Sequence, residues 1–398
     1  MNWIQKVVNA HRENEAPEYF FYWAAVTALS AVVKKNVFME RYFYKLYPNI
    51  YVFIVAKSGM KKGVPVALAK KMVEKANCTR VISGRNSVQS IVQTLGKASI
   101  EGGGVIDKAQ ALIVSGELAA LLVRDPAGLT ILTDLHNTHE YEKEWVNTLK
   151  GEGGHGVVDR LRSPCITLLG ATNEDHFVDA VPQVDVKGGF IARTFIVHSN
   201  ERGTPNPLTE KPTTLIDIDD LSLYLKEAAQ VRGEFQWSAA AKIYYDAWYR
   251  DMMAHFPDES TGTFGRIGDQ VVKLAMLISL SKNFDLIITE EDVIEAKVSA
   301  YRCADGMRQV TMGAGSSSYT AQTKLVLKAL IASPDNRIDR KKLLSRYWGD
   351  LDAPTLDIVI ETLLGGDIIA VYRQGANCVY EMKKKALEEY IQFTKRIQ

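Results

Sequence analysis

The sequence predicts an α/β fold with a parallel sheet, preceded and followed by helices. Between residues 49 and 204, five apolar runs typical of buried strands alternate with segments of helical spacing. This alternation is typical of a parallel sheet whose strands are joined by helices. A chain of 398 residues is also long enough for two or three domains, each with a buried core.

The predicted elements divide the chain into four parts. Residues 1–48 are expected to form an N-terminal helical segment, and residues 49–204 to hold the sheet. After a linker rich in Pro and Thr, residues 215–312 have helical spacing throughout. Residues 319–398 follow a second linker, GAGSSS, and predict three helices and two strands. That order is typical of a winged helix-turn-helix.

Composition narrows the class of protein. The net charge of +1 means that any contact with nucleic acid must come from local basic patches. The four cysteines are far apart in the sequence, which argues against a disulfide framework and fits a reducing cytoplasm. The apolar stretch 19–33 has no preceding basic region, so we interpret it as a buried helix and expect no membrane association. We expect no zinc site, because His136 and His139 lack the HExxH spacing.

A loop with features of a phosphate site follows the first predicted strand. Aligned with the Walker A pattern GxxxxGK[ST], residues 56–63 read AKSGMKKG, which places Lys62 at the phosphate-binding lysine and keeps Gly59 for the turn. Ala56 and Lys61 replace glycines, and Gly63 removes the hydroxyl that would contact Mg²⁺. The expected nucleotide contacts are Ser58, Gly59, Met60, Lys61, Lys62, Gly63 and Val64. The alternative is a basic turn between a strand and a helix.

Three polar residues at other strand ends fit the same chemistry. Glu117 ends the strand ALIVSGE and could polarise a water for attack on a phosphate, although Gly116 replaces the usual preceding aspartate. Asn173 ends the strand in LLGATN, where it could sense a γ-phosphate or cap a helix. Arg193 precedes the last strand and could neutralise transition-state charge across a subunit boundary, or form a surface ion pair.

Taken in order, these motifs resemble those of the helicase-like AAA+ ATPases of phages, plasmids and other mobile elements, similar to superfamily 3 helicases. The resemblance covers roughly residues 15–310 and includes LYPNIYVFIVAKSGMKKG, CITLLGATNEDHF and GGFIART. It implies a P-loop NTPase core, a helical lid and a homo-oligomeric ring that uses ATP and Mg²⁺ on DNA. It also implies that Lys62 holds phosphate, Glu117 activates water, Asn173 is a sensor and Arg193 is a finger for the neighbouring subunit. Within FGRIGDQVVKLAM, Arg266 becomes a candidate second sensor.

Two regions are candidates for DNA contact. Residues 142–163 predict a hairpin with Lys150 and His155 near its tip, the place where superfamily 3 helicases contact single-stranded DNA in a central pore. Lys341, Lys342 and Arg346 could contact phosphate from the C-terminal domain. The predicted recognition helix PTLDIVIETLLGG carries acids and no basic residue, so this domain could instead pack against a protein.

The leading functional hypothesis is an oligomeric ATPase that acts in DNA replication as a helicase or as an origin-remodelling factor. One rival is a scaffolding protein that binds nucleotide without hydrolysing it, which the missing magnesium partners favour. A second rival is a winged-helix DNA-binding regulator with a vestigial loop. No primase-like segment is evident in the sequence, so priming would need a partner protein.

Overall fold

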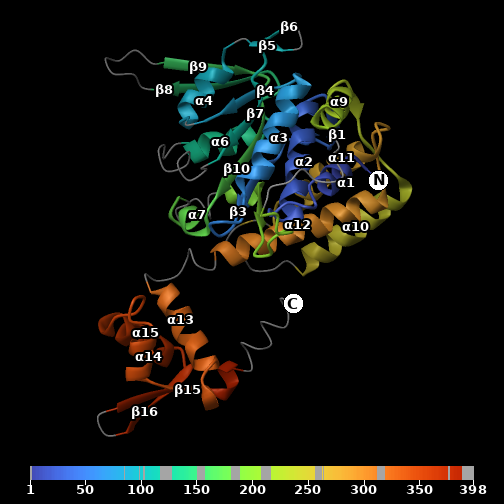
Figure 1. The fold of residues 1–398 in the computed structure, drawn as a ribbon. Helices are drawn as coiled ribbons and strands as arrows, with labels where there is room; N and C mark the ends of the chain where they lie inside the picture. Colours follow the sequence, from blue (N-terminus) through green and yellow to red (C-terminus); the bar gives the residue numbers. More distant parts are fainter. Residues whose placement is uncertain are drawn as a thin grey trace. The chain divides into compact units, whose positions relative to one another are not determined.

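The structure is a computed structural model that describes residues 2–84, 86–97, 99–101, 104–116, 128–149, 157–180, 189–207, 217–255, 262, 264–311, 319–374 and 377–387. The chain forms two compact units, residues 1–311 and residues 312–398 (Figure 1). The first three parts predicted from the sequence lie in the first unit, and the fourth lies in the second.

The first unit is built on a five-stranded sheet in which every strand is parallel to its neighbours. The strands are β3 (Tyr51–Val55), β4 (Arg80–Ser83), β7 (Gln110–Ser115), β10 (Cys165–Thr172) and β11 (Thr194–His198). Their spatial order is β11-β3-β10-β7-β4, so β3, the first of these five strands in the sequence, lies between β10 and β11, the last two. Residue Tyr51 of β3 pairs with Leu168 of β10 and with Thr194 of β11. The predicted α/β fold with a parallel sheet is confirmed.

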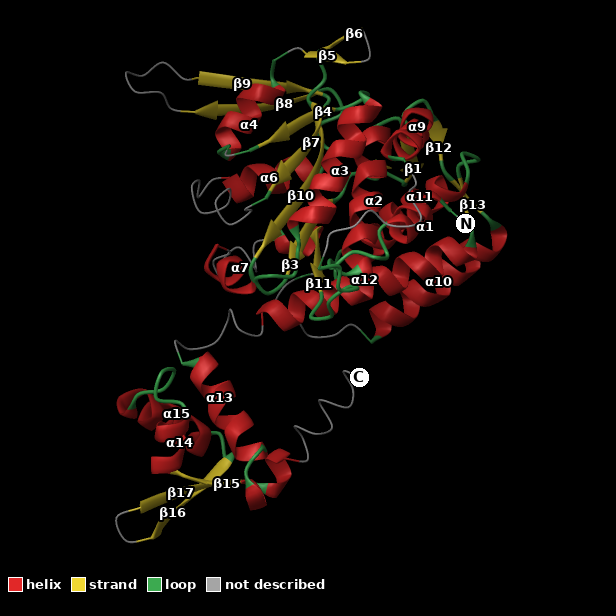
Figure 2. Ribbon diagram, in the orientation of Figure 1, coloured by secondary structure: helices red, strands yellow, loops and turns green. Residues whose placement is uncertain are grey.

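Both faces of the sheet are covered by helices, which explains the continuous apolar runs. Val52 and Ile54 of β3 pack with α2 (Glu18–Val33), α3 (Gly63–Ala76) and α11 (Ile267–Lys282). Tyr51, Phe53 and Val55 point to the other face and pack with α4 (Val88–Leu95), α6 (Gly128–His136) and α7 (Glu174–Ala180). Figure 2 shows the resulting three layers. Each large apolar side chain buried in this way contributes about 1.5–3 kcal/mol.

The N-terminal helix α2 belongs to the core of the first unit. Its residues are buried on nearly all sides, from Phe20 to Val33, because α1 (Trp3–Ala10), α3, α9 (Ile218–Ala228) and α11 surround it. This environment accounts for the absence of a polar face in its sequence. Among the described residues, no helix has the length and apolar character needed to cross a membrane.

The first unit also contains further helices and short strands outside the central sheet. Helices α10 (Ala239–Ala254) and α12 (Glu290–Thr311) pack on each other, and α12 also packs on β11. Strands β8 (Glu144–Leu149) and β9 (Val157–Arg162) form an antiparallel hairpin. The remaining short strands are β1 (Val37–Glu40), β2 (Lys45–Leu46), β5 (Ser99–Glu101), β6 (Gly104–Ile106), β12 (Gly233–Glu234), β13 (Gln236–Trp237) and β14 (Ile287–Ile288).

The second unit has its own hydrophobic core. Its helices are α13 (Thr320–Ile331), α14 (Arg340–Arg346) and α15 (Ala353–Gly365), and its strands are β15 (Arg337–Asp339), β16 (Ile369–Gln374) and β17 (Asn377–Met382). The strands pair antiparallel in the order β15-β17-β16. The predicted three helices and hairpin are thus present, and β15 is an additional short strand between the first two helices.

Candidate functional site

The carboxyl edge of the sheet has a topological switch point between β3 and β10. The chain leaving β3 enters α3 on one face of the sheet, whereas the chain leaving the adjacent β10 enters α7 on the other face. Ligands of open parallel sheets bind at such switch points, because the two connections diverge and leave a gap above the strand ends. The topology therefore indicates a ligand site between residues 56–63 and Asn173.

Lys62 and Asn173 meet at this switch point. The ammonium group of Lys62 donates to Asn173 Oδ1 at 3.0 Å, to the Ala56 carbonyl at 2.7 Å and to the Lys57 carbonyl at 2.8 Å. A lysine has three donors, so these three acceptors use all of them. An anion that binds Lys62 must replace at least one of these contacts.

The loop between β3 and α3 is shaped by two left-handed residues. Gly59 has φ +84°, and Lys61 has φ +51°. A left-handed conformation costs an L-residue other than glycine roughly 1–2 kcal/mol. Two contacts hold the loop: Met60 is buried in the core, and Lys61 pairs with Glu15 at 3.2 Å.

Helix α3 presents its amino end to this loop. It begins at Gly63, one residue after Lys62, so its first N–H groups and its dipole favour an anion there. Pro65 in the first turn has no N–H and removes one of the donors that such a site can offer. A Cβ atom built at Gly63 would meet nothing within 4 Å, so the missing hydroxyl has room.

An acidic residue that the sequence reasoning missed adjoins this pair. The carboxylate of Glu174 pairs with His198 Nε2 at 3.0 Å. Burial lowers the pKa of Lys62, and the charge of Glu174 opposes this effect. Glu174 directly follows Asn173, whereas His198 ends a strand two places away in the sheet. Only the strand order reveals that the two residues are neighbours.

The predicted water-activating residue, Glu117, lies outside the described residues, which reach Gly116 after β7. Ser115 at the end of β7 is buried, and it pairs with Gly170 of β10. Strand β10 separates β7 from β3. Among the described residues, no group of three or more His, Cys, Asp or Glu side chains could hold a metal ion.

Arg193 and Arg266 lie together at the opposite edge of the sheet. Arg193 precedes Thr194, the residue that pairs with the first residue of β3, whereas Lys62 follows the last residue of that strand. Five strand residues at about 3.3 Å each place the two edges roughly 17 Å apart. Both guanidinium groups lie beside Gly189. A Cβ atom built on this glycine would be 2.8 Å from Arg193 Nη1 and 3.9 Å from Arg266 Nη2.

The Arg193 side chain is buried and firmly held. Its Nε donates to Asn137 Oδ1 at 3.1 Å, and its Nη1 donates to the Gly189 carbonyl at 2.7 Å. Burial, and then the charge of Arg266, lower the pKa of Arg193 to about 10. The structure therefore brings Arg266 beside Arg193 and not beside Lys62 of its own chain.

The structure describes some of the predicted DNA-contact residues but not others. Lys150 and His155 lie outside the described residues, between the two arms of the β8–β9 hairpin. Lys341, Lys342 and Arg346 are exposed on α14 of the second unit. Asp357 on α15 is bound by Arg340, whose Nη2 donates to it at 3.0 Å. This ion pair neutralises one of the acids that argued against DNA contact by α15.

The end of the sheet between β3 and β10 gathers groups that can hold an anion. A lysine, a polar side chain and the amino end of a 14-residue helix converge there, and the loop residues Lys57 and Ser58 are exposed. A scan against protein-family models and a search of curated proteins both found no match to this chain.

Proposed function

We propose that this protein is an ATPase that works on DNA as a homo-oligomeric ring, with ATP bound by residues 58–64 of the loop after β3. The observation that carries the proposal is the 3.0 Å contact between Lys62 Nζ and Asn173 Oδ1 at the switch point between β3 and β10. Two residues that are 111 positions apart in the chain meet at the place where this kind of sheet binds ligands.

Each of the residues at the switch point has a role in the proposed reaction. Lys62 exchanges one of its carbonyl acceptors for a phosphate oxygen, and the amino end of α3 stabilises the same negative charge. Asn173 positions the Lys62 ammonium and orients the attacking water. ATP supplies the phosphoryl group that is transferred to water, and Glu117 is the proposed acceptor of the proton from that water.

The proposed site is shared between subunits. Arg193 is held about 17 Å from the loop of its own chain, so it is proposed to complete the site of a neighbouring subunit. Arg266 lies beside Arg193, and we propose that it acts at the same boundary. A contact that joins two different faces of the same protein generates a ring when the rotation closes.

DNA is the proposed substrate of the motor. Lys150 and His155, which lie in sequence between β8 and β9, are proposed as one contact to phosphate, and the exposed cations of α14 as a second. The second unit is proposed to be a winged helix-turn-helix, on the basis of its helices and its β16–β17 hairpin. A primase or other replication protein is the proposed partner.

A second function is favoured by one specific observation. Gly63 and Gly116 provide no side chain for Mg²⁺, although each has open space around its Cβ position. A protein that binds ATP for structural purposes, without turnover, would have this arrangement.

The two functions are separated by measuring ATP hydrolysis with and without single-stranded DNA. We expect hydrolysis in the wild type that DNA stimulates and that both Lys62→Ala and Glu117→Gln abolish. Lys57→Ala is the matched control, because Lys57 is an exposed lysine of the same loop that offers only its carbonyl to Lys62. ATP binding without turnover at any concentration of DNA or Mg²⁺ would instead establish the structural function.

A further inference from the structure

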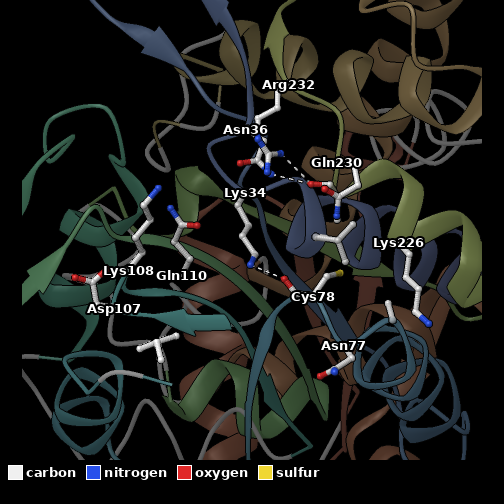
Figure 3. A pocket seen from close by; sticks show the side chains of 14 residues that line it. Lys34, Asn36, Asn77, Cys78, Asp107, Lys108, Gln110, Lys226, Gln230 and Arg232 are labelled. Carbon is white, nitrogen blue, oxygen red and sulfur yellow. Dashed lines mark hydrogen bonds between the residues drawn. The ribbon is translucent and has the colours of Figure 1, made fainter. Parts of the chain in front are cut away.

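A second concave site lies at the amino edge of the sheet. It is a cavity of about 760 Å³ lined by β6, by the start of β7 and the residues before it, and by the carboxyl ends of α2, α3 and α9 with the residues that follow them. Figure 3 shows Lys34, Lys108, Lys226 and Arg232 around this cavity, with Asp107 as its one carboxylate. Helix α3 has its amino end at the loop with Lys62 and its carboxyl end here, so its 14 residues separate the two sites by about 21 Å.

The charges of the cavity do not balance. Four cations and one carboxylate leave an excess of three positive charges, and Asp107 is already paired with Arg162 at 2.6 Å. Three helices end at the cavity, and each carboxyl end contributes about half of a negative charge. These ends offset only about half of the excess. Cations gathered in a partly enclosed space repel one another and attract anions.

Two of the four cations donate hydrogen bonds to backbone carbonyls, and the other two do not. Lys34 donates to the Cys78 carbonyl at 2.5 Å, and Arg232 donates to the Ala229 carbonyl at 2.9 Å, so these two cap helix ends and the turns that follow them. The side chains of Lys108 and Lys226 are exposed, and neither ammonium group makes a hydrogen bond or ion pair with another described residue. They come from opposite sides of the cavity, one from the start of β7 and one from α9.

We propose that this cavity binds phosphate groups, with Lys108 and Lys226 as the principal ligands and Arg232 and Gln110 as supporting donors. Its volume lies within the range of about 300–1,000 Å³ that is typical of small-molecule sites. The phosphates belong either to a free phosphate compound or to the backbone of a nucleic-acid strand. Both sources offer the same chemistry, and the experiment below distinguishes them.

The test uses Lys108→Gln/Lys226→Gln in a protein that also carries Lys62→Ala, so that the loop at the opposite edge does not contribute. The matched control is Lys71→Gln/Lys97→Gln in the same background, which removes two exposed lysines outside the cavity. The probes are inorganic pyrophosphate and a single-stranded oligodeoxynucleotide, measured by titration at several salt concentrations. Thermal unfolding verifies that both proteins are folded.

We expect the cavity variant to bind at least one probe about tenfold more weakly than the control, because it loses two lysine contacts to phosphate. If the oligonucleotide is the ligand, the plot of log K against log salt becomes shallower by about 1.4, since two phosphate contacts are lost. A loss confined to pyrophosphate assigns the site to a free phosphate compound. Equal affinities of cavity variant and control for both probes would overturn the proposal, as would the absence of saturable binding of either probe.

Discussion

Mixing two inactive variants tests whether the proposed active site is shared between subunits. Lys62→Ala removes the ammonium at the carboxyl edge of the sheet, and Arg193→Ala removes the guanidinium at the amino edge. Each variant alone is expected to lose ATP hydrolysis. In a mixed ring, a Lys62→Ala subunit still offers its arginine to a neighbour that retains the lysine, and some sites are restored.

The distance between Lys62 and Arg193 within one chain explains why activity in the mixture would depend on a neighbouring subunit. The two edges are about 17 Å apart along β3, and Arg193 is held in place by Asn137 and Gly189. In one chain the guanidinium therefore cannot reach a phosphate bound at Lys62. When the two variants assemble at random in equal amounts, about one quarter of the interfaces combine an intact lysine with an intact arginine, because the proposed interface is heterologous. We expect about one quarter of the wild-type rate.

The assay is the rate of phosphate release with single-stranded DNA, for each variant alone and for the mixture after the subunits have exchanged. Arg193→Ala also loses two hydrogen bonds, at a cost of about 1–3 kcal/mol, so its unfolding is measured in parallel. Arg193→Lys keeps the charge and serves as a second variant if Arg193→Ala does not fold. A mixture that co-assembles but is no more active than its components would refute the shared site.

Four further predictions follow from local geometry. Burial lowers the pKa of Lys273 to about 8, below the unfolded value of about 10.4, so unfolding takes up protons between these values. In that window the wild type should gain about 3 kcal/mol of stability relative to Lys273→Met, and an unchanged difference in denaturant unfolding at pH 7.5 and pH 10 contradicts this sign. Gly63→Ser should fold normally, gain roughly 0.5 kcal/mol and lower the Mg²⁺ concentration for half-maximal hydrolysis; an unchanged requirement argues against a magnesium role at this position. Gly59→Ala should lose about 1–2 kcal/mol in thermal or denaturant unfolding, because its φ is +84°; wild-type stability would show that the loop relaxes without cost. Lys342→Ala/Arg346→Ala should reduce the salt dependence of duplex DNA binding, and an identical slope would exclude α14 from the contact.

The sequence was sufficient to predict the parallel sheet and the positions of its five strands. The apolar runs were long because both faces are covered, so that Tyr51 and Val52 bury their side chains on opposite sides of the sheet. The turn from that first strand into a helix was also predictable, and its role as a phosphate site, based on the spacing of Lys62 and Gly59, stays a prediction. These features are local, and local patterns are readable in one sequence.

Relations between distant segments were not readable. The contact between Lys62 and Asn173 depends on strand order, which places the fourth strand beside the first. The proximity of Arg266 to Arg193 depends on how α11 packs at the amino edge, where Gln270 donates to the Ala192 carbonyl at 3.0 Å. The basic cavity joins Lys34, Lys108 and Lys226 from three separate parts of the chain, and no spacing in the sequence predicts such a group.

The central claim is that ATP binds at the loop that follows β3. The most direct measurement is an equilibrium titration of wild type, Lys62→Met and Lys57→Met with ATP. Loss of a hydrogen-bonded charge contact of about 1.5–3 kcal/mol predicts affinity about ten- to a hundredfold weaker for Lys62→Met. Lys57→Met should bind as the wild type does, because the Lys57 contact to Lys62 is made by its carbonyl. Equal affinities for all three proteins would contradict the claim and place the nucleotide elsewhere.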